Sequence, residues 1–133
     1  MYMLDTNILV YAIRHPKDGV HEIIKRHIFA DLCISAITLG ELEYGVQKSA
    51  NPHRNRLALM EVLSGIEILD FDSAAAVHFG DIFASLERTG QRIGDRDMLI
   101  AAHARALGYT LVTNNTREFD RVKGLTVEDW LIR

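Results

Sequence analysis

The chain has 133 residues, 48% hydrophobic and 25% charged, which is enough for one domain with a buried core, and we expect a single domain over residues 1–133. The net charge of −3 argues against a protein that holds nucleic acid by bulk charge alone, although it leaves room for local basic patches. No apolar run approaches the roughly 18 residues that span a bilayer, no signal peptide is recognisable, and Cys33 has no second cysteine with which to form a disulfide, so a cytoplasmic protein without membrane contact is expected.

Short apolar runs alternate with stretches of helical periodicity along the chain. The apolar runs predict buried strands at residues 2–4, 32–34, 66–69 and 109–113, with a possible fifth at 125–127. The periodic stretches predict helices at residues 8–13, 20–29, from Ser35 or Thr38 to about 48, 52–65, 73–90 and 95–107. Asp72 and Asp95 are the expected caps of the last two helices.

Strands that alternate with helices predict a parallel sheet covered on both faces, which is an α/β sandwich. The chain has no internal repeat, low-complexity tract or linker. In open parallel sheets, ligands and reactive groups collect outside the carboxyl ends of the strands. Acidic residues at such positions are therefore the first candidates for a functional site.

Asp5 directly follows the first strand, and Asp97 falls in the first turn of the helix over residues 95–107. Both positions also suit a purely structural acid, because a carboxylate near a helix N-terminus interacts favourably with the helix dipole. The helix behind Asp97 is apolar on most sides, which predicts a central helix whose start lies at the mouth of the core. An acid there is well placed to meet Asp5.

Glu41 and Glu43 lie on the helix that follows the second strand. Thr38 and Glu41 have the spacing of a capping box, which would make Glu41 structural. On a helical wheel, however, Glu41 lies opposite the core face of Leu39, Leu42 and Val46, on a side that suggests a shallow cleft. That side also carries Ile37, Tyr44 and Gly45. Spacing alone does not decide between the two glutamates.

The fourth strand ends in a polar segment, Thr113-Asn114-Asn115-Thr116-Arg117-Glu118, that mirrors the position of Asp5. The two asparagines also suit a simple turn. If the acids of these segments converge, they cannot all stay ionised without a counter-charge. Magnesium, which typically takes one or two carboxylates plus water, is the natural counter-charge. Such a site would activate water for displacement at phosphorus.

Four stretches that carry these acids occur in order. They are Met3-Leu4-Asp5-Thr6-Asn7, Ile34-Ser35-Ala36-Ile37-Thr38-x-x-Glu41-Leu42-x-x-Gly45, Ile93-Gly94-x-x-Asp97-x-x-Ile100-Ala101-x-His103-Ala104 and Leu111-Val112-Thr113-Asn114-Asn115-Thr116-Arg117-Glu118-Phe119. Together they resemble the PIN-domain ribonucleases, and within them the VapC toxins of VapBC toxin–antitoxin pairs. The resemblance covers essentially the whole chain. It implies a PIN-like three-layer α/β/α sandwich with a small central parallel sheet of four to five strands.

The resemblance also implies residue roles. Asp5 and Asp97 match the principal metal ligands, and Glu41 rather than Glu43 matches the family's glutamate after the second strand. Glu118 matches the fourth acidic position. The catalytic set is therefore Asp5, Glu41, Asp97 and Glu118, with Thr113 and Asn115 supporting the cluster or contacting phosphate. Relatives often have an acid where Asn115 stands, which puts tight binding of a second metal in doubt.

The implied activity is that of a magnesium-dependent (or manganese-dependent) endoribonuclease that hydrolyses structured RNA, commonly tRNA, and inhibits translation until its antitoxin neutralises it. The implied partner is a VapB-type antitoxin that occupies the active-site cleft and carries the DNA contact. A homodimer, and a higher assembly with the antitoxin, are also expected. Basic residues near the motifs are candidates to line an RNA groove: Arg14, Lys48, Arg92, Arg96, Arg117 and Arg121.

Two other classes of function remain open from the sequence. A PIN-like module could bind RNA or a protein without catalysis, although all four acidic positions are filled. Alternatively, Asp5 could be the nucleophile of a phosphatase of the haloacid-dehalogenase type. That class requires a second aspartate two residues later, and this chain has Asn7 there.

Overall fold

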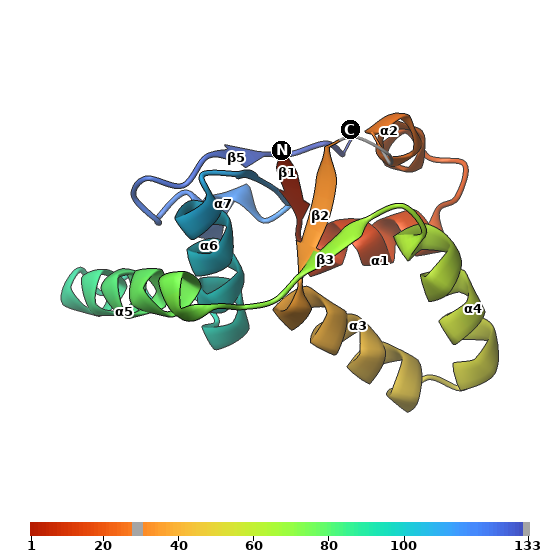
Figure 1. The fold of residues 1–133 in the computed structure, drawn as a ribbon, viewed down its shortest axis with the longest axis horizontal. Helices are drawn as coiled ribbons and strands as arrows, with labels where there is room; N and C mark the ends of the chain where they lie inside the picture. The colour runs from red at the N-terminus through yellow and green to blue at the C-terminus, as the bar shows by residue number, and fades with distance from the viewer. Residues whose placement is uncertain (28–30, 132–133) are drawn as a thin grey trace.

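Five short parallel strands form one sheet in the computed structural model, which describes residues 1–27 and 31–131. They are β1 (Tyr2–Leu4), β2 (Leu32–Ser35), β3 (Glu67–Leu69), β4 (Thr110–Val112) and β5 (Val127–Glu128). The order across the sheet is β3-β2-β1-β4-β5, so β1 is the central strand (Figure 1). The predicted α/β class, the parallel sheet and the strand number are confirmed.

Helices cover both faces of this sheet. On one face lie α1 (Thr6–Arg14), α2 (Gly19–His27), α3 (Ala36–Lys48) and α4 (Pro52–Leu63), and on the other lie α5 (Ser73–Arg88), α6 (Asp95–Leu107) and the short α7 (Thr116–Phe119) (Figure 1). The sequence predicted the first six helices but not α7. Residues 28 and 29, the predicted end of α2, lie outside the described residues. No helix within 1–27 or 31–131 combines the length and apolar character needed to cross a membrane.

Side chains of the central strands alternate between two apolar cores. Met3 and Leu111 are paired neighbours that face the α5–α6 side, whereas Leu4 and Val112 are paired neighbours that face the α1–α4 side. All four are fully buried. Because both faces are covered, the strands are continuous apolar runs rather than alternating ones, as is typical of parallel sheets.

The strands that follow β1 in the chain are added first on one side of β1 and later on its other side. The chain first builds β2 and β3 on one side of β1, then crosses through α5 and α6 and returns as β4 on the other side. A crevice opens at such a switch point because the connections that follow the two neighbouring strands leave over opposite faces. Asp5 and Thr113 are the residues that follow β1 and β4 at this point.

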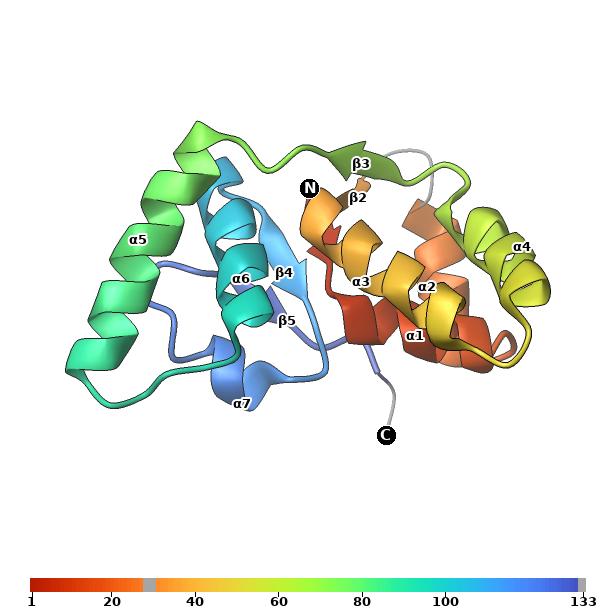
Figure 2. The ribbon, with the colours of Figure 1, turned by 90° about the horizontal axis from the view of Figure 1, so that it is seen from below.

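Helix α6 is central, as predicted, and lies between α5 and strands β4 and β5 (Figure 2). It ends where predicted, at Gly108, whose φ of 70° is a left-handed conformation that favours glycine. Its buried His103 makes a 2.8 Å hydrogen bond between Nδ1 and the Ser35 hydroxyl, which caps α3. This bond joins the helix of Asp97 to the helix of Glu41. Burial lowers the pKa of His103, so the ring is held neutral.

One predicted helix start is wrong, and the structure decides another that the sequence left open between Ser35 and Thr38. Gly94, not Asp95, is the N-cap of α6, and the Asp95 carboxylate instead accepts a 2.7 Å hydrogen bond from Arg92. Thr38 is not part of a capping box, because α3 begins earlier, with the Ser35 hydroxyl accepting from the Ile37 amide at 3.1 Å. In the first case Arg92 engages the carboxylate that was expected to cap the helix, and in the second Ser35, one of the two predicted starts, is the cap.

Asp72 provides a test of local stability, because its carboxylate caps α5 by accepting from the Ala75 amide at 3.0 Å. Replacing it by alanine leaves that amide without an intramolecular partner. We expect Asp72→Ala to lower the free energy of unfolding by about 1 kcal/mol, measured by urea denaturation. Asp72→Asn keeps an acceptor and should stay close to wild type. Equal losses in the two variants would contradict the capping role.

Candidate active site

Asp5 is held rigidly at the carboxyl end of β1. The residue is only 2% exposed, and both carboxylate oxygens accept hydrogen bonds. The Thr6 amide donates to Oδ1 at 2.8 Å, and the Thr113 hydroxyl donates to Oδ2 at 2.8 Å. Asp5 therefore caps α1 and at the same time binds the end of β4. A carboxylate that is buried and engaged at both oxygens is badly placed to attack a phosphate, which disfavours the phosphatase alternative.

The pKa of Asp5 is raised to about 6 from an ordinary value of 3.8. Burial is the largest cause, and the negative charges of Asp97 and Glu41 raise it further, whereas the hydrogen bonds from Thr113 and Thr6 oppose the shift. The free chain thus carries a carboxylate whose negative charge is poorly compensated at neutral pH. A nearby cation would relieve this.

Thr113 connects Asp5 to the polar segment after β4. Its fully buried hydroxyl donates to Asp5 and accepts from the Asn115 amide at 3.0 Å. The Asn115 side-chain amide in turn donates to Oε2 of Glu118 at 3.1 Å. Asn115 also begins helix α7, whose first turn holds Glu118. This chain of hydrogen bonds fixes Glu118 relative to Asp5 through two short polar residues.

Asp97 lies in the first turn of α6, as predicted, and is half-buried. Its pKa is raised, first by burial and then by the negative charges of Glu41 and Glu118, while the guanidinium of Arg96 opposes the shift. These causes place Asp97 within electrostatic reach of both glutamates. They also show that the site holds more negative charge than its one neighbouring arginine offsets.

Glu41 extends from α3 toward the same region and is held at both oxygens. The Thr6 hydroxyl donates to Oε1 at 2.7 Å, and the Arg96 Nε lies 3.0 Å from Oε2. Glu43, by contrast, is paired with Arg56 of α4 at 2.8 Å. The structure thus separates the two glutamates that spacing left equal: Glu41 faces the acids, and Glu43 links two helices at the surface.

The four candidate acids therefore converge at the switch point of the sheet. Asp97 interacts electrostatically with Asp5, Glu41 and Glu118, and it opens into a cleft of about 410 Å³ that Glu41 and Arg96 also line. The supporting pair, Thr113 and Asn115, lies among them. Every candidate site residue predicted from the sequence is thus found at one edge of the sheet.

The donor set of the four converging acids, of which Glu41 and Asp97 line the cleft, fits a hard divalent cation. All four candidate side chains offer carboxylate oxygens, which magnesium prefers. The pKa of Asp5 and of Asp97 is raised, first by burial and then by the negative charges of neighbouring acids. No group of three or more His, Cys, Asp or Glu side chains among residues 1–27 and 31–131 is arranged as a ready-made cage. The fit to magnesium therefore rests on the chemistry of the donors, since magnesium keeps several waters and uses one or two carboxylates.

Two functional contacts were not assigned from the sequence. Thr6 bridges the site, because its amide binds Asp5 and its hydroxyl binds Glu41. Arg96, predicted only as a possible groove residue, is the counter-charge of Glu41. Neither contact has a sequence signal of its own, since each depends on α3 lying against the start of α1 and α6.

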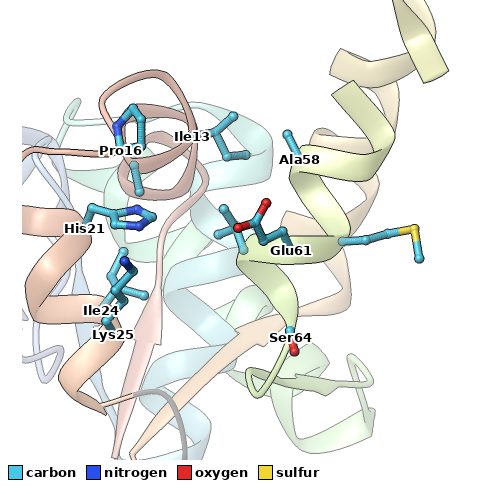
Figure 3. Close-up of a pocket in the computed structure, with 11 residues that line it drawn as sticks. Ile13, Pro16, His21, Ile24, Lys25, Ala58, Glu61 and Ser64 are labelled. Carbon is cyan, nitrogen blue, oxygen red and sulfur yellow. The ribbon is translucent and has the colours of Figure 1, made fainter. Parts of the chain in front are cut away.

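A separate pocket of about 700 Å³ lies between α1, α2 and α4 (Figure 3). Its walls are mainly apolar, and His21 of α2 and Glu61 of α4 extend into it from opposite sides (Figure 3). None of the four candidate acids lines it. This pocket is larger than the cleft of about 410 Å³ beside Glu41 and Asp97, but it lacks the cluster of carboxylates.

The pKa of Asp5 makes stability depend on pH. Because the value is about 6 in the folded chain and 3.8 ordinarily, the folded state binds this proton more tightly than the unfolded state. The resulting stabilisation is present below pH 3.8 and is lost as the pH rises through about 6. Over this interval we expect Asp5 to lower the free energy of unfolding by up to roughly 3 kcal/mol.

Urea denaturation in EDTA at a series of pH values would measure this effect. In Asp5→Asn the side chain still accepts from Thr6 but carries no charge. This variant should therefore lose most of the decrease and be more stable than wild type above pH 6. Parallel stability profiles for the two proteins would contradict the assignment.

Comparisons with known proteins agree with this geometry. The sequence matches the PIN domain family over residues 2–125. It is 47% identical to the tRNA(fMet)-specific endonuclease VapC of Shigella flexneri over 97% of both chains, and 47% identical to ribonuclease VapC2 of Haemophilus influenzae over 98% of both. The structure of VapBC2 from Rickettsia felis, bound to a DNA fragment from its promoter, aligns with a TM-score of 0.92 at 42% identity, covering 97% of this chain and 98% of that one. The chain belongs to the VapC ribonucleases of the PIN-domain family.

Proposed function

We propose that this protein is the toxin of a VapBC pair and acts as a magnesium-dependent endoribonuclease on structured RNA. The observation that carries this proposal is the convergence of Asp5, Glu41, Asp97 and Glu118 at the switch point of the sheet, with two raised pKa values. An acidic cleft is a poor receptor for RNA by itself. It becomes a good one only when a divalent cation neutralises it.

Asp5 and Asp97 are the proposed metal ligands. When bound, magnesium (or manganese) would supply positive charge at the scissile phosphate and make water a better nucleophile. Asp5 contributes rigidity, because its two hydrogen bonds fix the carboxylate before any metal arrives. Asp97 contributes access, because it is less buried and lines the open cleft.

Glu41 and Glu118 are proposed to orient the attacking water and to hold its proton. Each is already positioned by a hydrogen-bond donor, Thr6 for Glu41 and Asn115 for Glu118. The Arg96 side chain is 69% exposed and lies beside Glu41, where it can also contact phosphate. Thr113 acts through Asp5 rather than on the substrate, because it is fully buried.

The relatives suggest partners and substrate. Solved relatives from Rickettsia felis and Salmonella typhimurium are VapBC complexes bound to DNA. We propose a VapB-type antitoxin for this chain that blocks the cleft and provides the DNA contact, and a homodimer of the toxin. The VapC of Shigella flexneri is named as tRNA(fMet)-specific, and we propose tRNA as the substrate here, with inhibition of translation in the cytoplasm as the consequence.

A metal-ligand variant tests the catalytic assignment. We expect Asp97→Asn to lower the rate of magnesium-dependent RNA cleavage by roughly 100-fold or more, because it removes charge that positions the cation. Asp31→Asn, at the opposite edge of the sheet, is the matched control and should cleave like wild type. A folded Asp97→Asn protein with undiminished cleavage would overturn the assignment. A second pair of variants on α3 makes the same comparison: Glu41→Gln should lower the rate of RNA cleavage, and Glu43→Gln is its control and should cleave like wild type.

Metal binding can also be measured without catalysis. Magnesium that binds only the folded chain raises the melting temperature in a concentration-dependent manner. We expect this rise in wild type and in Glu43→Gln, and a smaller rise in Asp97→Asn. If magnesium stabilises all three proteins equally, it binds elsewhere, and the proposed metal ligands are wrong.

The substrate is best identified by sequencing RNA 5′ ends after the chain is expressed in a bacterial host. We expect new 5′ ends concentrated within a small set of structured RNAs, tRNA among them, and absent from an Asp5→Ala control. Ends spread over unstructured messenger RNA, or equally frequent in the control, would contradict the proposed substrate class.

A further inference from the structure

A second groove adjoins the cleft lined by Glu41 and Asp97. It has a volume of about 650 Å³ and lies between α1, α3 and α6. Glu41 and Arg96 line both the groove and the cleft, so the two spaces share a wall. The lining residues that matter below are Arg14, Gly40, Tyr44, Gly45, Lys48 and Arg96.

The groove is basic in an acidic protein. Arg14, Lys48 and Arg96 line it, against Glu41 as the one carboxylate among its lining residues, while the whole chain has a net charge of −3. Glu41 is moreover already paired with Arg96. Arg14 and Lys48 are the last residues of α1 and α3, so two exposed cations stand at the helix ends that border the groove. A polyanion that reaches the carboxylates along this groove would meet positive charge on its way.

Tyr44 presents an accessible aromatic face in the same groove. It is 62% exposed, which is unusual for a large aromatic residue in the middle of a helix. The Lys48 ammonium lies 5.0 Å from the centre of its ring. Lys48 therefore covers one face of the ring as a cation–π partner, and the 62% exposure shows that much of Tyr44 is not packed against protein. A flexible lysine can leave this face and bind an adjoining phosphate.

Two glycines keep the groove open. Gly40 and Gly45 lie inside α3, with no positive φ and with nothing within 4 Å of the place where a Cβ would be. Neither packing nor backbone conformation therefore requires glycine there, although glycine destabilises a helix interior relative to alanine. The absent side chains leave space beside Tyr44 and Glu41.

We propose that this groove is an RNA subsite in which one unpaired base stacks on Tyr44 while Arg14 and Lys48 bind the flanking phosphates. The inference rests on the proposed function, because it concerns how the same substrate reaches the same carboxylates. Unpaired bases stack on aromatic side chains, and sequence-tolerant binding of single strands combines such stacking with basic side chains along the backbone. The subsite would select an RNA loop over a duplex, whose bases are already stacked.

Equilibrium binding in EDTA tests the subsite without requiring cleavage. The probes are a fluorescently labelled RNA hairpin with an unpaired loop and a fully paired RNA duplex. We expect wild type to prefer the hairpin, and Tyr44→Ala to weaken hairpin binding by roughly tenfold. Tyr44→Phe keeps the aromatic face and should bind like wild type. Because Tyr44 is exposed, neither substitution disturbs the core.

Two further variants test separately the positive charge of the groove and its open volume. Lys48→Gln should weaken binding of hairpin and duplex alike and reduce the salt dependence of binding by about one counterion. Lys123→Gln, on an exposed lysine outside the groove, is the charge-matched control and should change neither. Gly45→Leu should fill the groove and weaken hairpin binding, while its melting temperature stays at or above that of wild type.

The outcomes distinguish the subsite from the nuclease activity. If wild type binds the hairpin and Tyr44→Ala does not, the subsite stands, even if magnesium produces no cleavage and the proposed activity fails. If wild type cleaves RNA and Tyr44→Ala matches it in both binding and KM, the subsite is overturned and the activity stands. A Tyr44→Ala variant that loses self-association in sedimentation while keeping hairpin affinity would assign the groove to a second copy of the chain, and would also overturn the proposal.

Discussion

The hydrogen bond from the Thr113 hydroxyl to Asp5 joins the ends of two neighbouring strands that are 108 residues apart in the chain. It can form only if β4 returns to the side of β1 opposite β2, which requires the whole crossover through α5 and α6. The bond therefore depends on the complete fold and at the same time makes the buried carboxylate tolerable. Without Thr113 and Thr6 as donors, the desolvated charge of Asp5 would have no compensation inside the protein.

The unfavourable buried charge of Asp5 lies at the carboxyl edge of the sheet, close to the other candidate acids. Apolar packing on both faces of the sheet stabilises the fold. This stabilisation offsets the repulsion between the negative groups that lie close together at the carboxyl edge of β1 and β4. Asp97 is half-buried and lines the cleft, whereas Asp5 is buried and does not line it. Strain of this electrostatic kind is typical of sites that await a cation or substrate.

Sequence patterns predicted the features that depend on residues close together in the chain, such as strands, helix bounds and caps. The apolar runs of β1, β2 and β4, the bounds of α6 and the cap at Asp72 follow from periodicity and capping chemistry. Residue spacing on a wheel also placed Glu41 in a cleft with Tyr44, where the structure has it. The missed contacts, Arg96 with Glu41 and Thr6 with Glu41, depend on how helices from distant segments pack. The choice of Glu41 over Glu43 needed either family resemblance or the fold itself.

The hydrogen bond between His103 and Ser35 has a consequence for how the protein tolerates change. It spans 68 residues and joins α6 to the start of α3 within the core. The separation of Asp97 from Glu41 is thereby fixed from the inside, independently of the loops that connect α3 to α6 at the surface. Insertions and deletions in the turn at residues 49–51, which is remote from this bond and from the cleft, are then expected to leave the arrangement of Asp97 and Glu41 unchanged. The bond therefore holds α6 and α3 together from within the core, so substitutions on the outer surface of the molecule need not change how Asp97 and Glu41 lie relative to each other.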